Sequence, residues 1–168
     1  MNETRFRQVI GQSPAYWGGA AALALLVLAG LMAAHRMEEL GHVITGMDNQ
    51  VAWGLPHVFA VFLIVAASGS LNVASVASVF GRVEYKPLAR LSGLLAIALL
   101  VGGLAILVLD LGRPDRIGVA MTHYNFRSIF AWNILLYTGF LAVTALYLWV
   151  QMEARLGRHT RTVGTAAF

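Results

Sequence analysis

Four long stretches of this chain carry no ionised side chain, and each is long enough to cross a membrane. They run over residues 8–34, 49–81, 91–109 and 128–152. A helix of about 20 apolar residues spans the roughly 30 Å hydrocarbon core of a bilayer. Because lipid offers no water to the peptide groups, a hydrophobic run of this length must be helical. The pattern therefore predicts an all-α integral membrane protein built as a four-transmembrane-helix bundle.

The same pattern sets the expected boundaries. The spans are expected at residues 16–34, 53–80, 88–109 and 128–150. The expected regions are a cytoplasmic N-terminal segment at 1–15, a four-helix transmembrane domain at 16–152, and at 153–168 a cytoplasmic tail or the start of a further bundle. The first apolar run lacks a small-residue cleavage site followed by a polar mature start, so it is expected to remain as a helix.

Composition supports a membrane location. Hydrophobic residues make up 58% of the chain and charged residues 12%, which is about half the charged share of a soluble domain. Cysteine is absent, which excludes disulfides, cysteine-ligated zinc and cysteine-ligated iron–sulfur clusters on this chain. The formal net charge is +4, but the basic residues are scattered among connectors and ends. The lipid bilayer is therefore an expected partner, and nucleic acid is not.

The basic residues also predict how the spans are oriented. Of the twelve Lys and Arg residues, eight fall on the side that carries both chain ends. They are Arg5, Arg7, Arg82, Lys86, Arg90, Arg155, Arg158 and Arg161. Since cytoplasmic loops carry the excess of positive charge, both termini are expected in the cytoplasm, in a bacterial inner membrane. An aromatic belt at the inner boundary would consist of Tyr16, Trp17, Tyr147 and Trp149.

The opposite, outer boundary gathers most of the titratable side chains. The histidines expected there are His35, His42, His57 and His123, and the acids are Glu38, Glu39, Asp48, Asp110 and Asp115. Imidazoles change charge near neutral pH, so this grouping favours a site that handles protons or a polar headgroup. The alternative is that these connectors are simply polar.

Two of these residues are the main candidates for chemistry. His57 lies about one turn into the second span, after Trp53, and an ionisable group within a span usually faces a bundle interior, a partner or a cavity. A purely structural imidazole bonded to a carbonyl is the alternative. Asp110 ends the third span, where it could pair with Arg113 and Arg116 across a Gly/Pro turn. It could instead act as a proton relay.

Neither haem nor a metal is expected on this chain. Bis-histidine haem needs two imidazoles that face each other inside the bundle, and only His57 lies within a span. A redox role would then use a cofactor that diffuses or one that sits on a partner.

Small and amide side chains within the spans predict contacts between helices. The second span has a ridge of small residues at Ala66, Ser70, Ala74 and Ser78. Such a ridge lets another helix approach closely. Asn72 and Asn133 are amides within apolar spans, and each is expected to form a hydrogen bond across helices.

Several short motifs, taken in order, resemble the NrfD/PsrC family of membrane subunits. They are Trp53–Gly54–Leu55 ahead of a long small-residue helix, Asp110–Leu111–Gly112–Arg113–Pro114, and Asn125–Phe126–Arg127–Ser128 leading into Trp132. The stretch from His42 to Trp149, with Thr45–Gly46–Met47 and Phe80–Gly81, is most similar to the DsrP-like branch of polysulfide reductase membrane subunits. The resemblance covers residues 37–152 and corresponds to the N-terminal half of such proteins, which usually have eight or more spans.

The resemblance implies a function in electron transfer. Such subunits exchange electrons and protons with a quinone, here menaquinone or ubiquinone, without haem or metal of their own. They work with an iron–sulfur subunit and with other membrane and catalytic subunits, here in sulfur-compound metabolism. In the polysulfide reductase type the headgroup lies near the outer side. The matching candidates for headgroup binding are Asn49, Trp53, His57 and Tyr124, and the candidate catalytic residues are His57 and Asp110.

Two other classes of function stay open at the level of sequence. The chain could be a structural membrane anchor that supports assembly and has no quinone site. It could also be half of a small transporter or channel, although that function favours an ionisable residue near mid-membrane, and Asn72 and Asn133 are not ionisable.

Overall fold

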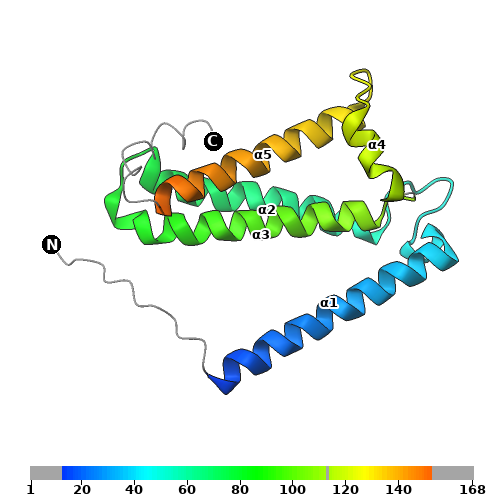
Figure 1. The fold of residues 1–168 in the computed structure, drawn as a ribbon, viewed down its shortest axis with the longest axis horizontal. Coiled ribbons are helices and arrows are strands. Elements are labelled where there is room, and N and C mark those ends of the chain that lie inside the picture. The colour runs from blue at the N-terminus through cyan, green and yellow to red at the C-terminus, as the bar shows by residue number, and fades with distance from the viewer. Residues whose placement is uncertain (1–12, 113, 153–168) are drawn as a thin grey trace. The chain divides into compact units, whose positions relative to one another are not determined.

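The structure is a computed structural model that describes residues 13–112 and 114–152. Within these two ranges the regular elements are all helical (Figure 1). The long helices are α1 (Pro14–Leu40), α2 (Leu55–Ser78), α3 (Lys86–Leu109) and α5 (Ile129–Met152). The connectors contain 3-10 turns at His42–Thr45, Val83–Tyr85 and Pro114–Arg116, and the short helix α4 (Ile117–Thr122).

All four long helices are apolar and long enough to cross a membrane, so the predicted fold class is confirmed. Their starts reflect local chemistry, because α1, α2 and α3 each have a proline in the first two positions. Proline fits there since the first N–H groups of a helix have no intrahelical acceptor. Helix α1 runs past the predicted end at Ala34 and stops before Gly41, whose φ of 82° ends the helical conformation. Helix α4 was not predicted.

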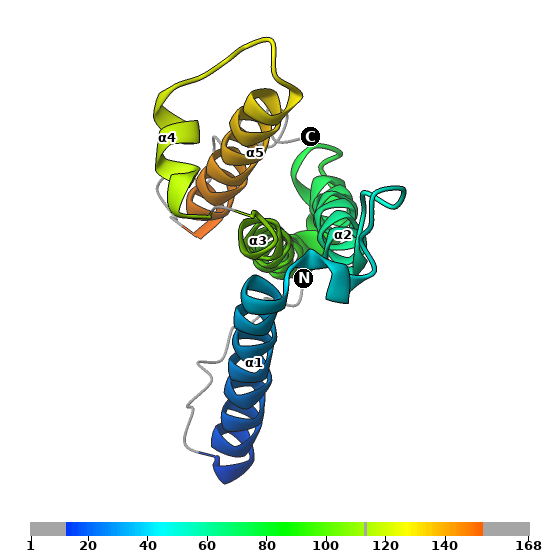
Figure 2. The same ribbon diagram turned by 90° about the vertical axis from the view of Figure 1, so that its right-hand side faces the viewer.

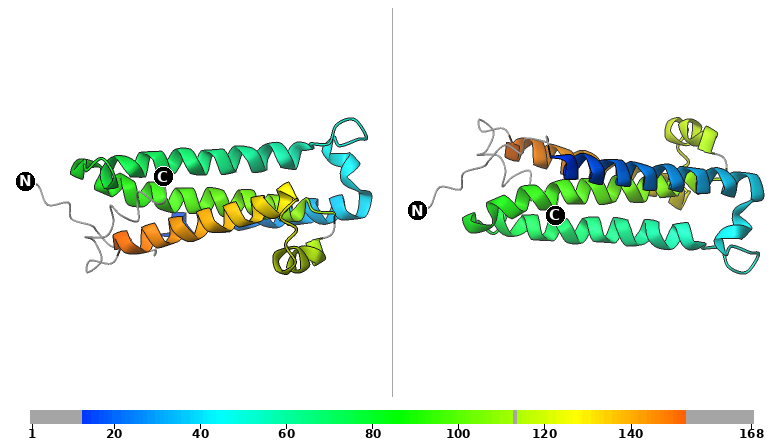
Figure 3. Two further views of the ribbon diagram at one scale, coloured as in Figure 1. Left: turned by 90° about the horizontal axis from the view of Figure 1, so that it is seen from above. Right: turned by 90° about the horizontal axis from the view of Figure 1, so that it is seen from below.

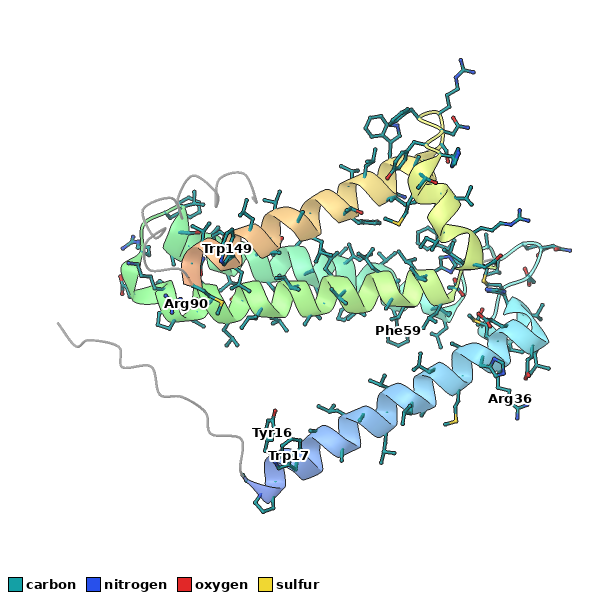
Figure 4. All side chains as sticks on the ribbon, in the orientation of Figure 1. Tyr16, Trp17, Arg36, Phe59, Arg90 and Trp149 are labelled. Carbon is teal, nitrogen blue, oxygen red and sulfur yellow. The ribbon has the colours of Figure 1, made fainter. Side chains whose placement is uncertain are left out.

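The chain forms two compact units, residues 1–44 and residues 45–168. The first unit contains α1, on whose first turn the rings of Tyr16 and Trp17 meet edge to face at 5.5 Å (Figure 4). The second unit contains the three other long helices and α4. The second unit carries the chemistry described below.

In the second unit, α2 and α3 run antiparallel and side by side, and α3 lies between α2 and α5 (Figures 2 and 3). Their contact is made mostly of small residues. The buried positions include Ala60, Ala67, Leu71 and Ala74 on α2, and Ala89, Gly93, Ala96, Leu100 and Gly103 on α3. Steps of three, four and seven residues keep these positions on one face of each helix. Close backbone approach of this kind drives helix association in lipid, where apolar burial gives little advantage.

Helix α5 joins this pair at its C-terminal end. Tyr147 is fully buried, and its hydroxyl donates to Ser78 Oγ at 2.8 Å and lies 3.3 Å from the Ala74 carbonyl oxygen. Arg90 Nη2 donates to the Gln151 carbonyl at 3.0 Å, at the same end of the unit where Trp149 lies (Figure 4). Two residues of the small-residue ridge, Ala74 and Ser78, thus contact the hydroxyl of Tyr147. Tyr147 is a core residue rather than part of an aromatic belt, so the belt prediction was wrong for it.

The prediction for the two amides was also wrong. Asn72 and Asn133 are exposed on α2 and α5. Neither side chain makes a hydrogen bond to another helix within the part of the chain that the structure describes. Polar contacts between helices are made instead near the helix ends, by Tyr147, by Arg90, and by His57 on α2 with Asp110 at the end of α3.

Candidate functional site

A tight turn precedes α2 and fixes the backbone on which the candidate site is built. Asp48 Oδ1 accepts hydrogen bonds from the backbone N–H of Gln50 at 2.7 Å and of Val51 at 2.6 Å. The Asp48 N–H in turn donates to the Val51 carbonyl at 3.0 Å. These backbone donors, that of Val51 first, hold the pKa of the Asp48 carboxyl below its usual value. The turn is therefore ordered best when Asp48 is ionised.

Gly54 joins this turn to the helix. It is buried at the N-cap of α2, and a Cβ atom added there would clash with Thr45 Oγ1 and lie 2.8 Å from Met47 Cγ. The part of the connector that contains Thr45 and Met47 therefore packs directly on the backbone at the start of α2. Only glycine permits this close approach. In the sequence Gly54 stands out only as part of a motif, without a role of its own.

The central feature of the site is a pair formed by His57 and Asp110. His57 Nδ1 lies 2.7 Å from Asp110 Oδ2, which is an ion-pair distance without the angles of a straight hydrogen bond. The Asp110 side chain is 2% exposed and that of His57 is 27% exposed. Because α2 and α3 are antiparallel, the start of one and the end of the other meet at the same end of the unit (Figure 1).

Each of the two charges would be disfavoured by the dipole of its own helix. An imidazolium on the first turn of α2 would lie at the positive end of α2, and a carboxylate after α3 would lie at the negative end of α3. Either charge alone would be unfavourable in this setting. When both are present, the attraction between them offsets that cost.

Part of the His57 ring is accessible from outside the unit. Nδ1 is buried against Asp110, so the exposed part of the ring lies away from that atom and includes the edge that carries Nε2. The indole of Trp53 stacks on this imidazole, with ring centres 6.0 Å apart and planes at 23°. Trp53 is itself 62% exposed. The arrangement offers a flat aromatic surface beside a nitrogen that can donate or accept a proton.

The other predicted binding residues lie apart from this pair. Asn49 is exposed in the Asp48 turn. Tyr124 is half-buried in the connector between α4 and α5, where its ring stacks on Phe126 at 6.0 Å. The structure thus brings Trp53, His57 and Asp110 together, but it does not show Asn49 or Tyr124 in contact with them.

The structure adds a partner for Asp110 that the sequence did not name. The predicted salt bridge with Arg113 and Arg116 stays a prediction, because Arg113 lies outside the described residues, and the structure shows His57 beside the Asp110 carboxylate. The signal was present in the sequence. Consecutive spans are antiparallel, so residues near the start of the second span and the end of the third must lie at the same side of the membrane.

Comparison with known proteins identifies the family. The family model described as polysulphide reductase, NrfD, matches residues 43–166. A relative from Archaeoglobus fulgidus, named Hdr-like menaquinol oxidoreductase integral membrane subunit, is 30% identical over 148 residues, which cover 88% of this chain and 37% of the relative. A protein from Halobacterium salinarum, provisionally named as a membrane subunit of dimethyl sulfoxide reductase, is 35% identical over 134 residues, which cover 79% of this chain and 31% of the relative.

A third relative, from Mesobacillus selenatarsenatis, is named as a subunit of selenate reductase. It is 21% identical over 140 residues, covering 83% of this chain and 33% of the relative. The chain thus spans about a third of the length of the curated relatives that it matches. No solved structure matches it. The extent of the family match and the four apolar helices show that this chain is a multi-pass membrane protein that belongs to the polysulphide reductase NrfD family.

Proposed function

We propose that this chain is the quinone-reactive membrane subunit of an oxidoreductase complex and that it binds the quinone headgroup at the outer end of α2. The observation that carries the proposal is the buried His57–Asp110 pair at the end of two apolar spans. An ionisable pair in such a place is costly and usually serves a ligand or a proton path. The name of the Archaeoglobus fulgidus relative, a menaquinol oxidoreductase subunit, supports a quinol as the ligand and menaquinone over ubiquinone.

The residues present fit a quinone headgroup. A flat ring can stack on the exposed face of Trp53, and a ring oxygen can then meet the Nε2 edge of His57. The surrounding helices are apolar, as an isoprenoid tail requires. A quinol bound there supplies two electrons and two protons when it is oxidised. Asn49 and Tyr124 remain candidates for further contacts with the headgroup.

The role of His57 follows from its two nitrogens. Nε2 would take one of the two quinol protons, and the ring would release the proton on Nδ1 to Asp110 Oδ2, 2.7 Å away. The imidazole would then be neutral with its proton on Nε2, and the carboxyl would hold the other proton at the membrane boundary. Loss of that proton from Asp110 to water and return of the ring proton to Nδ1 would prepare the pair for the second quinol proton. General-base assistance of this kind contributes about 10²- to 10⁴-fold to a rate. In the reverse direction the same two residues deliver protons.

The proposed setting follows the family resemblance. Electrons would pass to or from an iron–sulfur subunit, and the complex would act on sulfur compounds. The relatives are named as subunits of oxidoreductases and reductases, which supports a multi-subunit complex. We propose a cytoplasmic membrane location with both ends of the sequence in the cytoplasm, because eight of the twelve Lys and Arg residues fall on that side.

The test compares single variants in the purified complex. His57→Gln and Asp110→Asn should each lower quinol-linked turnover by about 100-fold and weaken the binding of a quinone-analogue inhibitor, with all subunits still associated. His123→Gln is the matched control, because His123 is an exposed histidine whose Nδ1 contacts the neighbouring Thr122 hydroxyl. Unchanged turnover and binding in both His57 and Asp110 variants would refute the proposal and leave the chain as a structural anchor.

A further inference from the structure

Helices α2 and α3 meet at a point where one glycine has no room for a side chain. A Cβ atom added at Gly103 would lie 3.0 Å from Ile64 Cγ1, 3.1 Å from the Ala60 carbonyl oxygen and 3.3 Å from Leu63 Cβ. The next residue differs, since a Cβ atom at Gly102 would meet only Leu63 Cδ1, at 3.8 Å. The chain therefore offers two adjacent glycines in one helix, one tightly packed and one in ordinary contact.

The tight contact lies just below the His57–Asp110 pair. With a rise of about 1.5 Å per residue, His57 is about 4.5 Å above Ala60 and Asp110 about 10.5 Å above Gly103. Side chains on a helix tilt toward its N-terminus. His57 therefore points outward along α2 and Asp110 points back inward along α3. The opposite tilts bring the two side chains together although the two residues lie at different heights above the Ala60–Gly103 contact.

We propose that Gly103 is a positioning residue for the proton-exchanging pair, an inference that rests on the proposed function. The spacing of the two helices at Ala60 and Gly103 sets the distance across which His57 reaches Asp110. One neighbour of the missing Cβ is the Ala60 carbonyl, which is helix backbone and cannot rotate away. An added methyl group must therefore move the helices by a few tenths of an ångström, and a larger side chain must move them further.

The pair is sensitive to such a movement because His57 Nδ1 and Asp110 Oδ2 are only 2.7 Å apart. A misplacement of about 1 Å can cost about 100-fold in rate. Gly103→Ala should therefore lower quinol-linked turnover about threefold and Gly103→Val about tenfold. Gly102→Ala and Gly102→Val are matched controls, since they make the same substitutions one residue away, and their turnover should stay within about twofold of the wild type.

The experiment on the purified complex combines these variants with Asp110→Asn. If Gly103 acts through the pair, Gly103→Val adds no more than about twofold to the loss already caused by Asp110→Asn. A second measurement does not depend on turnover. The rate at which diethyl pyrocarbonate modifies His57, followed by peptide mass spectrometry, should change in Gly103→Val toward its value in Asp110→Asn and stay at the wild-type value in Gly102→Val.

The outcomes separate the two proposals. If His57→Gln and Asp110→Asn both leave turnover and inhibitor binding unchanged, the proposed function fails. If Asp110→Asn impairs them but the Gly103 variants behave like the Gly102 variants, or if the losses multiply in the double variant, the role of Gly103 is overturned while the proposed function stands. Should Gly103→Val not assemble, Gly103→Ala decides the matter, and wild-type behaviour of that variant counts against the role.

Discussion

Removing the hydroxyl of Tyr147 should weaken the attachment of α5 to α2 by a small and measurable amount. A phenol carries one proton, and the shorter of its two contacts with α2, 2.8 Å to Ser78 Oγ, identifies Ser78 as the main acceptor on that helix. Ser78 Oγ in turn donates to the Ala74 carbonyl at 3.1 Å. In Tyr147→Phe this second bond remains, so the contact between the helices is lost while Ser78 keeps its own acceptor.

The expected magnitude follows from that geometry. Hydrogen bonds between membrane helices average about 0.6 kcal/mol and reach about 1.7 kcal/mol, so Tyr147→Phe should cost about 1 kcal/mol. Tyr147→Ala should cost about 3–5 kcal/mol, because it also empties the space of a fully buried ring. In a double-mutant cycle with Ser78→Ala, the coupling free energy should be about 0.5–1 kcal/mol. Tyr137→Phe, at a half-buried position of the same helix, should stay within about 0.5 kcal/mol of the wild type.

The assay is unfolding of the purified protein in mixed micelles by sodium dodecyl sulfate, followed by tryptophan fluorescence. A coupling free energy near zero would show that the contact between Tyr147 and Ser78 does not hold the helices. A cost of Tyr147→Phe as large as that of Tyr147→Ala would refute the reasoning in a different way, because the hydroxyl rather than the ring would then account for the stability.

Two further predictions concern the turn before α2. Gly54→Ala should weaken quinone-analogue binding about tenfold, because the added Cβ would clash with Thr45 Oγ1; inhibitor titration checks this, and unchanged affinity would show that the turn does not position the site. The pKa of Asp48 is lowered by the N–H groups of Val51 and Gln50. The ionised Asp48 carboxylate therefore orders the turn completely at a pH above its pKa in the unfolded chain. This ordering is lost as the pH falls through its pKa in the folded protein. The protection of the Gln50 and Val51 amides, relative to the intrinsic exchange rate at each pH, should fall over that acid range and should already be low in Asp48→Ala at neutral pH.

The sequence alone determined the number of spans and their approximate boundaries. The reason is physical, since a run of about 20 apolar residues has one stable conformation in lipid. It also placed His57 and Asp110 at the same boundary and identified them as candidates, because ionisable residues are rare within such spans. The family resemblance that the sequence suggested agrees with the family match over residues 43–166.

Only the tertiary structure decided which side chains meet. Helix periodicity does not fix how an apolar helix is rotated, because every face of it is compatible with lipid. For that reason the amides Asn72 and Asn133 were expected inside the bundle and are exposed, whereas Tyr147 was expected at the surface and is buried. The 2.7 Å approach of His57 to Asp110 likewise depends on how closely α2 and α3 pack. That spacing is set by the absence of a side chain at Gly103, a property that becomes informative only when its neighbours are known.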